Sequence, residues 1–205
     1  MSRFPSVPEN ELSDAQKSAH KGVADLFSRF PSHLAQKNDE GVIYGPYSSL
    51  FYTEDISDPW FALASKVMRQ QRFTFKEKEL CILAVLSEYE IPYVHYAHSE
   101  IALSAGFTKE QAQQALHGKL PDGLDGRESA VYNLALTLTR LHGPLNGENF
   151  EQAREFLGRD GVAGVAHIVS GYIYVAMLSN ISDAGAPDTG DGISLATKDL
   201  DLASE

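Results

Sequence analysis

The run LCILAVL, residues 80–86, carries apolar side chains at seven successive positions between charged segments. A helix that is apolar all round must be enclosed by other elements, because no face of it favours water. This run therefore predicts a central helix over residues 76 to about 89, with the rest of the chain packed around it.

Helix-start signals recur along the rest of the chain. Ser13 with Gln16, and Thr108 with Gln111, have capping-box spacing, which predicts helices over residues 13–30 and 108–118. Pro92 favours a helix start, and this helix is expected to run over residues 92–105. Further helices are expected at residues 60–71, 127–141, 149–157 and 162–180, with an ordered loop at 41–52. The sequence predicts an all-α fold.

Composition limits the organisation and the partners. The chain has 205 residues, of which we assign 1–182 to one domain with its core at 40–182, and 183–205 to a flexible tail. A net charge of −11 argues against nucleic acid or an anionic membrane as a partner. The apolar stretch at 162–181 is interrupted by glycine and polar residues, so no membrane span is expected. We expect a cytoplasmic protein that acts on a small molecule.

Two histidines lie in the unusual stretch EIPYVHYAHSEIALSAGF, residues 90–107. His95 and His98 are three residues apart, so they share a face of the expected helix at the border of its packing stripe. Three interpretations are open at this point. Both rings can be satisfied by backbone or water, they can supply two metal ligands, or one of them can carry protons in general acid–base catalysis.

A partner for a catalytic histidine is expected from the preceding helix. Glu79 begins the apolar run and is therefore a candidate for burial, which costs several kcal/mol unless the acid is partnered or neutral. In a helical hairpin that turns at residues 89–92, Glu79 and His98 would lie roughly 4–8 Å out of level. A crossing angle, a long side chain or a water would have to close that gap. The alternative is a capping or surface acid.

The segment FKEKELCILAVLSEYEIPYVHYAHSEIALSAGFTKEQ resembles the carboxymuconolactone decarboxylase family, which includes the AhpD-type alkylhydroperoxidases. Glu79, Tyr93 and His98 match that family's glutamate, tyrosine and histidine. The resemblance implies an all-α, AhpD-like helical bundle with a central two-helix core, assembled as a homo-oligomer (dimer, trimer or hexamer). Ile91 and Val94 occupy the two cysteine positions, so the disulfide chemistry of the peroxidase branch is not expected.

The resemblance also implies a function. We expect a cofactor-independent acid–base enzyme that acts as a decarboxylase, isomerase or lactone-processing enzyme on a carbonyl or carboxylic substrate. His98 would shuttle the proton, Glu79 would hold its ring, and Tyr93 would bind an oxyanion. No metal and no organic cofactor is required by this chemistry.

Substrate contacts are harder to assign from sequence. We take His95, Arg72 and Tyr172 as candidates, with Arg69 as a second arginine that could bind a carboxylate. Aromatic residues at 44–52 are expected to line or cover the site, which favours a flat or hydrophobic substrate. Two other functions stay open: a non-catalytic oligomeric binding protein, and a metal-dependent enzyme built on His95, His98 and a glutamate.

Overall fold

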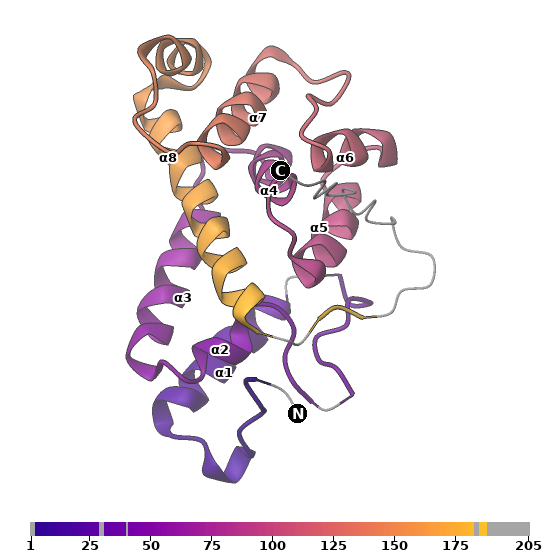
Figure 1. Ribbon diagram of the computed structural model, residues 1–205, viewed down its shortest axis with the longest axis vertical. Helices are drawn as coiled ribbons and strands as arrows, with labels where there is room; N and C mark the ends of the chain where they lie inside the picture. Colours follow the sequence, from indigo (N-terminus) through magenta and orange to yellow (C-terminus); the bar gives the residue numbers. More distant parts are fainter. Residues whose placement is uncertain (1–2, 29–30, 40, 183–184, 188–205) are drawn as a thin grey trace, which may run out of the picture.

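Helix α4 (Phe75–Leu86) lies at the centre of the fold, as its apolar sequence requires. Residues 80–85 have no solvent exposure at all. The helix packs against α5, α6, α7 and α8, and Figure 1 shows it between α8 and the α5–α6 pair. These neighbours span the following residues: α5 (Pro92–Ser104), α6 (Lys109–Leu116), α7 (Gly126–Thr139) and α8 (Gly147–Ile181).

This arrangement comes from a computed structural model that describes residues 3–28, 31–39, 41–182 and 185–187. The remaining elements lie before α4: η1 (Glu9–Glu11), α1 (Asp14–Phe27), α2 (Tyr47–Leu50) and α3 (Glu54–Met68). Within the described ranges no strand forms, although one isolated antiparallel bridge joins Lys37 to Ile43. The all-α prediction is confirmed.

The buried apolar side chains form two clusters that share helix α5. The larger cluster joins α4 to α6, α7 and α8, and α5 contributes Val94 and Ala102 to it. The smaller cluster joins α1 to the segment around α2, and α5 contributes Tyr93, Ala97 and Ile101. Helix α5 is therefore the wall between the two clusters, which explains why its apolar residues are spread around the helix.

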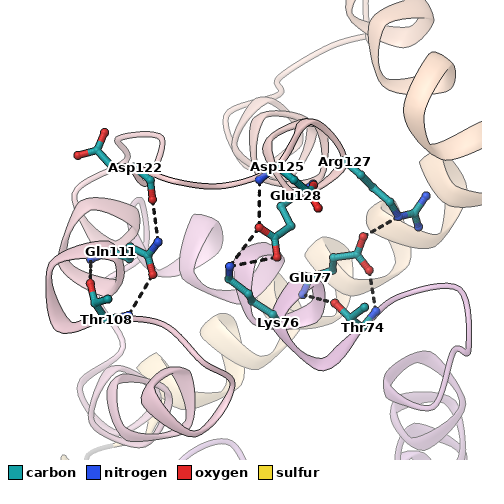
Figure 2. Close-up of polar contacts among 9 residues, drawn as sticks. All are labelled: Thr74, Lys76, Glu77, Thr108, Gln111, Asp122, Asp125, Arg127 and Glu128. Atoms are coloured by element: carbon teal, nitrogen blue, oxygen red, sulfur yellow. Dashed lines mark hydrogen bonds and ion pairs between the residues drawn. The ribbon is translucent and has the colours of Figure 1, made fainter.

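The start of α4 is held by a polar network (Figure 2). Thr74 caps the helix, and Glu77 completes the capping box by accepting a hydrogen bond of 2.6 Å from the Thr74 backbone N–H. The other oxygen of the buried Glu77 carboxylate accepts 2.6 Å from the Nε of Arg127 on α7. Arg127 also donates to the backbone oxygens of Phe156 and Arg72. The network joins α4 and α7 to α8 just before Glu79.

Helix α3 begins earlier than the sequence predicted. It starts at Glu54, and Pro59, which was expected at its first position, lies inside it. The first turn carries the acidic Glu54 and Asp55, which the helix dipole favours at this end. Proline removes only one backbone hydrogen bond there, so the helix continues through it. At α1 the expected end near residue 30 is replaced by an end at Phe27, and residues 29–30 lie outside the described part.

The two helices predicted at 149–157 and 162–180 both form, and they are the two segments of α8 on either side of a kink. The kink lies at Gly158, whose φ of 69° favours glycine. Among the described residues α8 is the one helix that is long and apolar enough to cross a membrane by length and composition alone, with a mean hydropathy of 1.6 over an 18-residue stretch, which is weak evidence for a membrane span. Its buried residues Val165, Ile168 and Val169 belong to the larger core cluster, which accounts for that apolar character without a membrane.

The end of the chain is described only in part. Of the predicted flexible tail at 183–205, only residues 185–187 lie within the described ranges, so the tail stays a prediction.

Replacing Glu77 with alanine is expected to lower the free energy of unfolding by about 2–3 kcal/mol, because it removes a buried carboxylate from Arg127 and from the Thr74 cap. Urea denaturation of both proteins measures this loss. Glu151→Ala is the matched control, since Glu151 pairs with Arg154 on the surface and its loss should cost less than about 1 kcal/mol. Equal losses in the two variants would contradict the anchoring role of Glu77.

Candidate active site

A buried carboxylate and an imidazole meet between the two central helices. Oε2 of Glu79 on α4 lies 2.8 Å from Nδ1 of His98 on α5. The side chains are only 2% and 7% exposed. The two groups contact each other directly, so no bridging water is needed to close the offset expected from helix geometry. Glu79 thus has the partner that a buried acid requires.

The other nitrogen of the His98 ring faces α8. Nε2 lies 3.1 Å from the hydroxyl of Tyr172, and the two rings meet edge to face with centroids 5.3 Å apart. In the neutral ring, Nδ1–H donates to Glu79 and Nε2 accepts from the Tyr172 hydroxyl. Burial raises the pKa of Tyr172 well above its ordinary value, with smaller contributions from Glu79 and Tyr47. Tyr172 is therefore a protonated hydrogen-bond donor at neutral pH.

The three side chains line a cavity of about 1270 Å³ that is also bordered by α1 and α3. This volume exceeds that of ordinary small-molecule sites, which are about 300–1,000 Å³. Most of the lining is apolar, and aromatic rings are prominent in it: Tyr47, Trp60, Phe61, Phe75, Tyr93 and Tyr174. Among the aromatic residues at 44–52 that were expected to line or cover the site, Tyr47 lines the cavity.

Helix α3 explains why there is space here. Ser57 is its one buried residue among the fifteen of the helix, although Trp60, Phe61 and Met68 line the cavity. The helix packs mainly on α1 and more lightly on α2 and α8. The apolar face of α3 therefore borders a hollow instead of filling a core.

His95 does not line this cavity, and the expectation that it binds substrate is corrected. Its Nε2 lies 2.9 Å from the backbone oxygen of Leu86, and its Nδ1 lies 3.0 Å from the backbone oxygen and 3.3 Å from the backbone nitrogen of Ile91. Burial lowers the pKa of His95, and hydrogen bonds to the backbone of Ile91 and Leu86 and the charge of Glu90 oppose this only in part. The neutral ring ties the end of α4 to the start of α5.

Arg72 and Tyr93 are also placed differently from the expectation. Nη1 of Arg72 donates to the backbone oxygen of Asp160 at 2.7 Å, and the side chain is not part of the cavity wall. The Tyr93 ring lines the cavity, but its hydroxyl donates to the backbone oxygen of Ala35 at 2.9 Å. Tyr172, predicted as a substrate contact, lines the cavity and also bonds to His98. Neither spacing nor residue type signals this bond, because it depends on where α8 lies.

Thiol chemistry has no suitable group in the described part of the chain. Cys81 has no solvent exposure, and burial raises the pKa of its thiol, so the reactive thiolate is disfavoured. Ile91 and Val94, at the cysteine positions of the resembled family, are buried.

A metal centre on the two histidines is not formed. Among the described residues no group of three histidine, cysteine, aspartate or glutamate side chains could hold a metal ion. His95 is turned to backbone atoms and His98 to Glu79 and Tyr172. The interpretation of His95 and His98 as a ligand pair is therefore wrong.

Two solved structures share this architecture. One is described as an alkylhydroperoxidase AhpD core, an uncharacterized peroxidase-related protein from Ralstonia eutropha JMP134. It is 20% identical, with a TM-score of 0.71, over 91% of this chain and 93% of the other. The second is the debrominase Bmp8, a cysteine-to-alanine variant in complex with 2,3,4-tribromopyrrole. It is 12% identical, with a TM-score of 0.68, over 92% and 93% of the two chains.

The fold is AhpD-like. No protein-family model matches the sequence. The search of curated proteins likewise finds no relative. At these identities the likeness concerns the AhpD-like fold, and membership of the carboxymuconolactone decarboxylase family stays a prediction.

The lowered pKa of His95 predicts how the protein responds to acid. The unfolded chain binds a proton near its ordinary pKa of about 6.5, whereas the folded state does not, so stability falls as pH drops below about 6.5 towards the folded pKa. Thermal unfolding between about pH 7.5 and 5 should therefore show a smaller loss in His95→Gln than in the wild type. If the two curves run parallel over this range, His95 does not carry the effect.

Proposed function

We propose that the protein is an acid–base enzyme that transfers protons to or from a hydrophobic carbonyl or carboxylic substrate, with His98 as the proton carrier. The observation that carries this proposal is the buried chain from Glu79 through His98 to Tyr172, which opens on the apolar cavity. A positioned histidine with a carboxylate on one nitrogen is the usual arrangement for general acid–base work.

Each of these three hydrogen-bonded side chains has a distinct role. Glu79 accepts the Nδ1 hydrogen, so it selects the tautomer that leaves Nε2 free of hydrogen and stabilises the ring once it is protonated. Nε2 of His98 removes a proton from a carbon next to a carbonyl group, or returns one to an enolate. The Tyr172 hydroxyl turns from Nε2 to the substrate and donates to the oxyanion that develops. Decarboxylation, isomerisation and lactone opening all use these steps.

The cavity favours a flat or hydrophobic substrate. Aromatic side chains such as Trp60 and Tyr174, which stack with ring centroids 6.1 Å apart, border the same hollow as His98. The debrominase that shares the fold was crystallised with a brominated pyrrole, a small flat ring compound, which agrees with a ligand of this shape. We extend to this chain only the shape and polarity of that ligand.

Assembly as a homo-oligomer and a cytoplasmic location stay predictions. Large apolar side chains are exposed on α3 and on the last turns of α8, including Leu63 (59%) and Met177 (57%). A second copy that covers these positions would remove apolar surface from water. The alternative of a non-catalytic binding protein would keep the cavity and the fold but would need no proton transfer at His98.

Replacing His98 with alanine is expected to lower proton-transfer activity at least about 100-fold, because the proton carrier is lost. The assay incubates the protein in D₂O with aryl ketones and β-keto acids and follows deuterium incorporation and CO₂ release by NMR. Glu79→Gln should also slow turnover, because the amide no longer stabilises the protonated ring. Turnover in His98→Ala at the wild-type rate would exclude His98 as the proton carrier.

Tyr172→Phe and Tyr93→Phe form a matched pair. We expect Tyr172→Phe to lower kcat about 10- to 1,000-fold, since the oxyanion donor is removed. Tyr93→Phe should leave kcat within about threefold and cost about 1 kcal/mol of stability, because among the described residues its hydroxyl bonds to the Ala35 backbone and not to His98. The reverse ranking of the two kcat values would return the catalytic role to Tyr93.

A further inference from the structure

Two cationic side chains, Arg69 and Lys78, line the cavity. Arg69 follows the last residue of α3, and Lys78 lies in the second turn of α4. They therefore flank the short loop that joins these helices. Within the described ranges neither side chain makes an ion pair or a hydrogen bond to another residue, which is unusual in a chain of net charge −11. Two cations without ion-pair partners among the described residues thus border a mostly apolar hollow.

Lys78 borders the same cavity as Glu79 and His98. Lys78 is the neighbour of Glu79, so the two Cα atoms are about 3.8 Å apart. Lys78 is partly buried, and this burial lowers the pKa of its ammonium, while the nearby Glu77 opposes the shift. Glu77 is already bonded to Arg127 and to the Thr74 backbone. A further anion in the cavity would therefore offset the desolvation of Lys78.

The carboxylates of the cavity wall do not neutralise the two cations. Glu79 is bonded to His98, and Asp25 comes from α1 and makes no ion pair with either cation in the described part of the chain. By contrast, Lys76, two residues before Lys78, pairs with Glu128 away from the cavity. The two lysines therefore have different surroundings. Lys76 pairs with Glu128 in the network at the start of α4, whereas Lys78 lines the cavity.

We infer that Arg69 and Lys78 bind the anionic group of the substrate, and that the substrate is a carboxylate with a flat apolar body. The inference rests on the proposed function for the identity of the reacting centre. The apolar body would lie along the aromatic wall that includes Trp60, and the carbon next to its carbonyl group would face His98. A guanidinium and an ammonium stabilise a carboxylate as the anion. The bound carboxylate is therefore an anchor, and any CO₂ lost comes from a different carboxyl group.

The test compares two probes of the same shape, 2-naphthoate and 2-naphthamide. Trp60 is the one tryptophan of the sequence and lines the cavity, so quenching of its fluorescence reports binding there. Isothermal titration calorimetry gives the dissociation constants. We expect the wild type to bind naphthoate at least about tenfold more tightly than naphthamide, as charge-assisted hydrogen bonds to two cations predict.

Three variants assign the preference to named side chains. Lys78→Gln and Arg69→Gln should each weaken naphthoate binding about tenfold and leave naphthamide within about twofold. Lys66→Gln is the matched control, because Lys66 is exposed on α3, lies outside the cavity wall and changes the net charge equally. It should alter neither affinity.

Three results would overturn the inference: equal affinity of the wild type for the two probes, no naphthoate binding up to its solubility limit, or an equal effect of Lys66→Gln. Turnover is not read in this experiment. His98→Ala should keep the preference for naphthoate. An intact preference together with failed turnover tests would therefore contradict the proposed acid–base chemistry and leave the anion site standing.

Discussion

The hydrogen bond between Glu79 and His98 is the interaction on which the organisation of this protein depends. An acid at the start of an apolar helix is a cost to folding unless a partner satisfies it. The partner comes from the next helix, so α4 and α5 must pack with their register fixed at this one contact. The network around Glu77 holds the end of α4 that precedes Glu79, and His95 closes the turn between the two helices. Structure on both sides of the pair thus limits how far it can move.

The site is placed where the two apolar clusters meet. Helix α5 contributes residues to both clusters. His98 lies on α5 at the boundary between the clusters, close to Tyr172 of α8. Helix α3 covers this boundary without filling it, which leaves room for a ligand beside a fully packed core. The position of His98 and the space of the cavity therefore depend on different parts of the fold. Helices α4, α5 and α8 hold His98, whereas α1 and α3 border the cavity.

Local sequence signals predicted the helices well where they act within one turn. The capping boxes at Ser13 and Thr108 both form, and Pro92 opens its helix. Prediction failed where a local signal competes with neighbours. Pro59 predicts a helix start because proline is favoured there, but the acidic turn before it begins the helix earlier. The two helices predicted within α8 are confirmed, because the backbone at Gly158 is not helical (φ 69°, ψ 172°) and separates the two segments.

The sequence by itself determined the all-α architecture and the central position of α4, because apolar periodicity and helix capping depend on residues close together in the chain. It offered Glu79 and His98 as one possible pair, and the tertiary structure placed them in contact. Only the tertiary structure decided that the tyrosine in contact with His98 is Tyr172 and not Tyr93. It also decided that Arg72 and His95 bond to backbone groups, and that Arg69 and Lys78 border the cavity. These contacts join residues far apart in sequence. Their existence depends on helix crossing and rotation, which no local pattern encodes.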